Sequence, residues 1–195
     1  MNNYEYIIAS LPVISSDFRG ELDSDAILEQ IHGQLSKRDS KNFAVLLDGF
    51  DSDKLGAEFY RKALKSRSAF IRGYFLYDLC VRNLKVQYLN RQLGRPENED
   101  VLDILGEEFE FADAEKVGEA LSGSDILGRE RALDDIMWAR IDELCGLQVF
   151  TADVIFGFVA KLQIVTRWLR LDPERGRELF KQLVDEIRNN KKPIE

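Results

Sequence analysis

The sequence predicts an all-α fold, a single-domain helical bundle of about six to eight helices. The 195 residues include only 13 Gly and 4 Pro, which suits helices better than a turn-rich β protein. Hydrophobic residues make up 45% and charged residues 32%, as in ordinary folded proteins. Apolar residues recur at helical spacing in several separate stretches. A chain of this length supports one substantial core, so we expect residues 1–195 to form one domain.

The first third of the chain predicts short elements. Residues 4–12, YEYIIASLP, fit a short strand or an extended segment that ends at Pro12, and their periodicity does not decide. Three short helices are expected over residues 23–35, 36–50 and 52–66. Ser36 and Asp39 have capping-box spacing at the start of the second.

Three long helices are expected near residues 67–93, 125–146 and 151–171. The first is apolar on several sides, which is typical of a helix at the centre of a bundle, and Gly94 and Pro96 give stop signals after it. Residues 97–125 are expected to form an acidic connecting region with short helices and mobile connections. Asp172 and Pro173 predict the start of a last helix, and residues 189–195 a flexible tail.

The most apolar stretch, residues 150–172, must be tested as a membrane span. A span needs about 20 mostly apolar residues. Here the longest uncharged run is Val154–Ala160, bounded by Asp153 and Lys161. We therefore expect a buried bundle helix and no direct membrane span, with Gly157 allowing close approach of a neighbouring helix.

Charge is unevenly distributed along the chain. The net charge of -8 disfavours nucleic-acid binding, which needs a basic face. Residues 61–95 contain nine Lys or Arg and one acid, whereas residues 97–125 contain eleven Asp or Glu and one base. Either the two stretches pair within the fold, or one of them docks on a protein partner of opposite charge. The candidate docking cations are Arg61, Lys62, Lys65 and Arg67.

No pattern in the sequence predicts catalysis, and we expect no catalytic residue, cofactor or metal. The one histidine, His32, excludes a di-iron site built from two Glu-x-x-His pairs. Residues 51–62 begin like a calcium loop, but Lys62 occupies the position of the closing Glu. Cys80 and Cys145 are far apart in sequence, which favours free thiols in a reducing cytoplasm.

A polar cluster interrupts the long helix near residues 67–93. Asp78 and Arg82 are four residues apart, the spacing of a side-chain ion pair, and Asn83 follows on another face. These residues form either a buried polar network or a partner-binding cluster. Trp138 and Trp168 leave the same choice open, between core packing and interface anchors.

Three stretches carry a family resemblance: YIIASLP, FIRGYFLYDLCVRNLKVQYLNRQLGR and FGFVAKLQIVTRWLRLDPERGRELFKQLVDEI. Together they resemble a poorly characterised bacterial family encoded among the subunits of V-type (archaeal-type) ATP synthases. The arrangement is also similar to the funnel-shaped helical protein that joins the rotor of V-type ATPases to their membrane ring, which has an acid and a nearby Asn-Arg pair on a long helix. Asp78, Arg82 and Asn83 would be the counterpart, with Arg and Asn in reversed order, and this chain is far shorter than that funnel.

The resemblance implies a non-catalytic structural or accessory component of a V-type ATPase. Such a component would contact rotor or membrane-ring subunits, as a coupling piece or an assembly factor. Its location would be cytoplasmic, at the inner face of the cell membrane through the complex. The alternative is a free-standing helical adaptor or regulator whose acidic residues 97–125 bind a basic protein.

Overall fold

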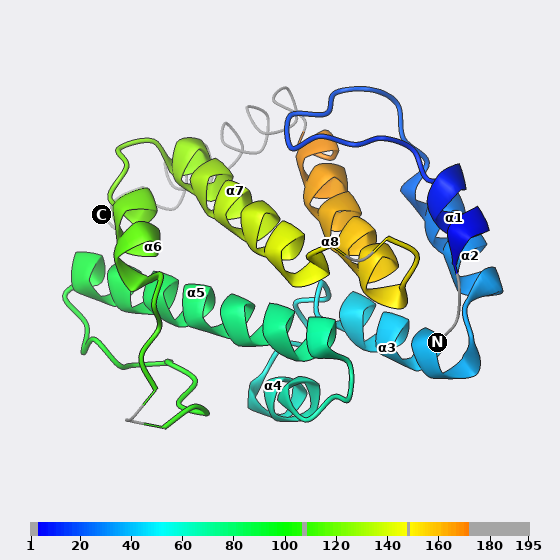
Figure 1. Ribbon diagram of the computed structural model, residues 1–195. Coiled ribbons are helices and arrows are strands. Elements are labelled where there is room, and N and C mark those ends of the chain that lie inside the picture. Colours follow the sequence, from blue (N-terminus) through cyan, green and yellow to red (C-terminus); the bar gives the residue numbers. More distant parts are fainter. Residues whose placement is uncertain (1–3, 107–108, 148, 172–195) are drawn as a thin grey trace, which may run out of the picture.

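Helix α5, Ala69–Leu93, is the longest helix of the described residues and packs against most of the others (Figure 1). The structure is a computed structural model that describes residues 4–106, 109–147 and 149–171. These ranges contain eight α-helices and no strand. The predicted all-α bundle is therefore confirmed.

The sequence of α5 explains both its ends and its central place. The Ser68 hydroxyl caps the helix by accepting a hydrogen bond from the Ile71 backbone N–H at 3.3 Å, and Gly94 ends it with a left-handed φ of 65°. Buried side chains face several directions around the helix: Phe70, Ile71, Tyr74, Phe75, Tyr77, Leu79, Cys80 and Val81. A helix with so wide an apolar surface needs neighbours on several sides, and α3, α4, α6, α7 and α8 supply them.

Helices α7, Ile126–Cys145, and α8, Ala152–Leu169, form an antiparallel pair on one side of α5 (Figure 1). Their bounds confirm the predicted helices near 125–146 and 151–171. Gly157 lets the pair approach closely, because a Cβ there would lie 2.3 Å from the Cys145 sulfur. Among the described helices, none combines the length and apolar character that crossing a membrane requires.

The N-terminal third forms a layer at the amino end of α5. It contains α1, Glu5–Ser10, α2, Ser24–Gln34, and α3, Lys37–Asp48, followed by α4, Ala57–Leu64, on the side of α5 away from α7 (Figure 1). The expected strand or extended segment at residues 4–12 was wrong for residues 5–10, which are helical and bury Ile7. A strand needs a partner for its backbone groups, and the described residues offer none, whereas a helix satisfies them internally.

The acidic connecting region contains one helix, α6, Ala114–Leu121, which packs on α5 and α7. Residues 97–106 form a loop beside the carboxyl half of α5 (Figure 1). The predicted last helix after Asp172 and the tail at 189–195 lie outside the described residues.

Candidate interaction surfaces

Asp78 lies at the contact between α4 and α5, where it accepts two hydrogen bonds. The Tyr60 hydroxyl donates to Asp78 Oδ2 at 2.6 Å, and the Arg82 Nε donates to the same oxygen at 2.8 Å. The Asp78 side chain is only 13% exposed, while that of Arg82 is 48% exposed. The predicted i,i+4 ion pair is therefore present, with its carboxylate inside and its guanidinium at the surface. Tyr60, which the sequence did not single out, supplies the third member.

The protonation states in this cluster follow from burial. Loss of hydration raises the pKa of Tyr60, and the Asp78 carboxylate raises it further, so the phenol stays neutral. Burial opposes the charge of Arg82, but the attraction of Asp78 outweighs it and the pKa of Arg82 is raised. The cluster therefore joins α4 to α5 through one charge pair and one neutral donor.

Asn83 lies on another face of α5 and holds the loop of residues 97–106, which we call the acidic loop. Its side-chain amide donates to the Leu102 carbonyl at 3.0 Å and accepts from the Leu102 N–H at 3.1 Å. Two turns later Asn90, which is 4% exposed, donates to the carbonyls of Glu97 and Glu99 at 3.1 and 2.7 Å. Asp78, Arg82 and Asn83 thus do not form one site. In the sequence, the seven-residue spacing of Asn83 and Asn90 puts both amides on the same side of α5, and this spacing could have indicated that they hold one loop.

Trp138 and Trp168 both lie at the α7–α8 pair and are half-buried. The Trp168 indole N–H donates to Asp134 Oδ2 at 2.6 Å, and Arg167 pairs with the same carboxylate. The Lys161 ammonium lies 4.6 Å from the centre of the Trp138 ring. Each tryptophan thus has contacts within its own chain that fix its position between the two helices.

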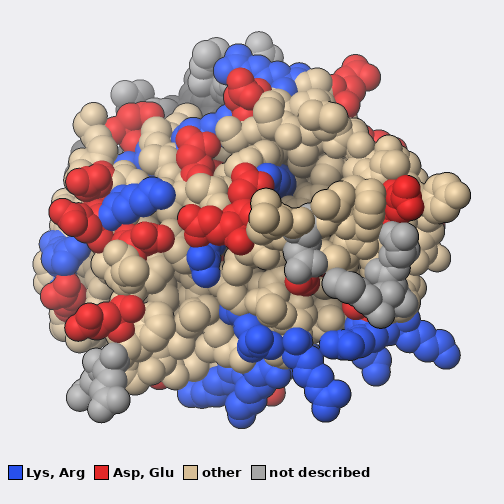
Figure 2. All heavy atoms as spheres, viewed as in Figure 1, with Lys and Arg blue, Asp and Glu red and all other residues tan. Residues whose placement is uncertain are grey.

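Lys and Arg side chains gather on one side of the molecule, below α3 and α4 in the view of Figure 2. Eight cations of α3, α4, the α4–α5 loop and the start of α5 are exposed, and none of the eight has a carboxylate within 4 Å in the described ranges. The loop between α4 and α5 brings the helices together here, since Ser66 Oγ lies 3.5 Å from Asn42 Oδ1 of α3. We define the basic surface as the exposed Lys and Arg of α3, of α4 and the loop after it, and of the first turn of α5: Lys37, Arg38, Lys41, Arg61, Lys62, Lys65, Arg67 and Arg72.

The basic surface contains all four predicted docking cations and adds three from α3 and one from α5. The α3 cations were missed because charge was counted along contiguous sequence, although Lys37, Arg38 and Lys41 share the exposed side of one helix turn. Between the basic stretch and the acidic stretch, Arg91–Glu97 at 2.8 Å is the ion pair formed within the described chain. None of the cations at residues 61–72 is therefore neutralised by an ion pair within the described residues.

The residues considered above as possible metal ligands or catalytic groups make contacts within the fold or are buried. Asp51 accepts from the Asp53 N–H at 3.1 Å and lies 3.5 Å from the Lys54 ammonium, in a turn before α4. His32 stacks on Phe43 with ring centres 5.7 Å apart. Burial raises the pKa of the Cys80 and Cys145 thiols to about 11, which leaves both protonated and weakly nucleophilic. No cluster of three or more His, Cys, Asp or Glu able to hold a metal occurs within the ranges that the structure describes.

Comparison with known proteins places the chain in a family without an assigned activity. The family described as "Protein of unknown function (DUF2764)" matches residues 51–191, which is well over half of the chain. The chain therefore belongs to this family. No curated protein and no solved structure matches it significantly.

Proposed function

We propose that this member of the DUF2764 family is a non-catalytic structural or accessory component of a V-type ATPase or ATP synthase. In this proposal its basic surface docks on an acidic face of a rotor or membrane-ring protein. The resemblance of three stretches to a family encoded with such proteins supports the choice of complex. The observation that supports docking is that the cations of the basic surface are exposed and form no ion pair within the described residues.

The physical argument rests on where the charge is held. Exposed cations with no internal partner keep their full field, which attracts an acidic surface over about 8 Å at physiological salt. Three of the cations, Arg61, Lys62 and Lys65, lie on or directly after α4, whose position is set by Tyr60 and Asp78 rather than by the cations themselves. Of the eight cations of the basic surface, Arg72 donates to the Ser66 carbonyl at 2.6 Å, and none forms an ion pair within the described residues. The protein would lie in the cytoplasm, at the inner face of the membrane, through docking of the basic surface.

The test is co-purification of the tagged full-length chain from its native cells. The proposal expects rotor or membrane-ring subunits in the eluate at moderate salt, and their loss at high salt. Recovery of the tagged chain without any ATPase protein would overturn the assignment to this complex. Recovery of one unrelated basic or acidic protein instead would support the free-standing adaptor.

A charge-reversal set tests whether the basic surface is the contact. Replacing Arg61, Lys62, Lys65 and Arg67 with Glu should abolish co-purification. The matched control reverses four exposed cations that lie outside the basic surface and form no ion pair in the described chain: Arg19, Arg95, Lys116 and Arg170. Both variants carry the same net charge, so equal loss in the two would show that overall charge, and not the basic surface, governs binding.

A further inference from the structure

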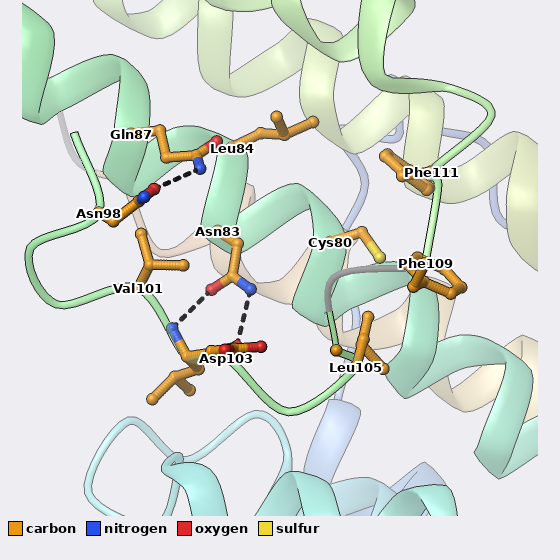
Figure 3. A pocket seen from close by; sticks show the side chains of 12 residues that line it. Cys80, Asn83, Leu84, Gln87, Asn98, Val101, Asp103, Leu105, Phe109 and Phe111 are labelled. Carbon is orange, nitrogen blue, oxygen red and sulfur yellow. Dashed lines mark hydrogen bonds between the residues drawn. The ribbon is translucent and has the colours of Figure 1, made fainter.

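A pocket lies between the carboxyl half of α5 and the acidic loop, and no residue of the basic surface lines it (Figure 3). Its volume is about 420 Å³, within the range of pockets that bind ligands. The amides of Gln87, Asn83 and Asn98 lie on one side of it, and Leu105, Phe109 and Phe111 on the other (Figure 3). Cys80 and Leu84 of α5 form part of the lining between them.

The walls of this pocket are fixed by hydrogen bonds. Asn83 uses both ends of its amide on the Leu102 backbone, and Gln87 Nε2 donates to Asn98 Oδ1 at 3.1 Å. Asn90 adds two bonds to the start of the loop. These contacts hold the loop beside α5 and leave Leu84 in the lining of the pocket. The pocket is therefore preformed, which lowers the entropic cost of binding.

The pocket has amide groups on one side, apolar side chains on the other, and acidic residues around its mouth. Phe109 at its edge is 40% exposed, so part of its ring is available for contact. The exposed carboxylates of Glu99, Asp100 and Asp103 belong to the acidic loop and that of Glu110 follows Phe109, and none of them forms an ion pair within the described ranges. Residues 96–115 contain no Lys or Arg. The field at the pocket mouth is therefore negative.

We propose that this pocket binds a short cationic and partly apolar segment of a partner protein. An apolar side chain of that segment would pack against Leu84, Leu105 and Phe109, and a neighbouring Lys or Arg would pair with Asp103. The apolar lining supplies burial, and the unpaired carboxylates select for positive charge. This inference does not depend on the proposed ATPase role, because a different surface and the opposite charge are involved.

The experiment uses a fluorescent 12-residue peptide with Leu and Lys at helical spacing and the full-length protein. Fluorescence anisotropy should show saturable binding that weakens with salt. A peptide with Glu in place of Lys, or with Ser in place of Leu, should not bind. Spermidine, which carries the charge without the apolar side chains, should not displace the peptide at equal charge concentration. Binding of the Ser peptide, or displacement by spermidine, would reduce the site to a charge effect and overturn the proposal.

Paired variants place the binding in the pocket. Asp103→Lys should weaken binding about tenfold, as expected for loss of a charge-assisted contact. Glu115→Lys makes the same charge change on exposed α6, outside the pocket lining, and should have a much smaller effect. Likewise, Phe109→Ala should weaken binding while Ile126→Ala, at an exposed apolar position on α7, should not.

Methyl NMR spectra of the unmodified protein locate the site directly. Added peptide should shift the signals of Leu84, Leu102 and Leu105 before those of core leucines such as Leu162. No binding, equal losses in each variant pair, or shifts confined to other methyl groups would each overturn the proposal.

Discussion

The basic surface and the acidic loop both depend on α5, but different contacts hold them there. The α4 part of the basic surface is anchored by Tyr60, which is 1% exposed and bonded to Asp78. The acidic loop is attached by the amides of Asn83, Gln87 and Asn90, which bind mostly backbone groups. A buried side-chain network cannot exchange its partners for water without cost, whereas the partly exposed amides of Asn83 and Gln87 can do so more easily, although Asn90 is itself buried. The difference predicts a globally stabilised basic surface and a locally stabilised acidic loop.

The largest expected effect comes from removing the shared carboxylate between α4 and α5. Asp78→Ala should lower the free energy of unfolding by about 2–3 kcal/mol, because it leaves the buried Tyr60 hydroxyl and the Arg82 guanidinium without their acceptor. Arg82→Ala should cost less than about 1 kcal/mol, since the Arg82 side chain is half exposed. Urea denaturation measures both. Equal losses would mean that the ion pair, and not the buried hydroxyl, holds α4.

The acidic loop should respond to Asn83→Ala by opening locally. Two backbone hydrogen bonds are lost, so the opening free energy of the loop should fall by about 1–2 kcal/mol while global unfolding changes less. Hydrogen exchange at the Leu102 amide measures the opening. Gln87→Ala, which removes a side-chain contact to Asn98 alone, should change that exchange rate less. An equal drop in global stability would contradict a locally held loop.

Alkaline pH offers a second view of the α4 anchor. Because the pKa of Tyr60 is raised in the folded state, the unfolded chain loses this proton first as pH rises through about 10, and stability falls with pH. Once the unfolded phenol is ionised, this group contributes a loss of about 1.4 kcal/mol per pH unit. Tyr60→Phe should remove that contribution from the slope of unfolding free energy between about pH 10 and 11.5. Identical slopes in the two proteins would show that Tyr60 ionises equally in both states.

The spacing of apolar residues predicted where the long helices lie in the sequence, but not which helices pack against one another. The predicted 67–93 and 151–171 differ by two residues or fewer from α5 and α8 at each end, because caps and apolar stripes are local signals. Residues 5–10 were misjudged, since six residues are too few for a period to distinguish helix from strand. The sequence of such a segment does not show which residues will pack against it, and these residues decide whether it forms a helix.

The candidate sites show the same limit more sharply. The Asp78–Arg82 pair was predictable because both residues lie on one helix, four positions apart. Tyr60 was not, because it comes from another helix and its hydroxyl reaches Asp78 only after α4 packs. The basic surface was recognised in part, since Arg61 and Lys62 are adjacent in sequence while Lys41 joins them through the fold.

The smallest expected effect compares the two charged regions directly. Lys62→Gln with Lys65→Gln, and Asp103→Asn with Glu110→Gln, each remove two exposed charges that lack an ion pair in the described chain. Each double variant should change stability by less than about 0.5 kcal/mol.

The sign of the change depends on which charges interact most. If repulsion between neighbouring like charges dominates, both variants gain a little stability at low salt, and these gains vanish near 1 M salt, where the screening length is about 3 Å. If the net charge of -8 dominates instead, the lysine variant loses stability while the acidic variant gains. Thermal unfolding across a salt series separates these two explanations. Stability changes of opposite sign at low salt would show that the basic surface stabilises this acidic molecule. In that case the basic surface would not be maintained for a partner alone.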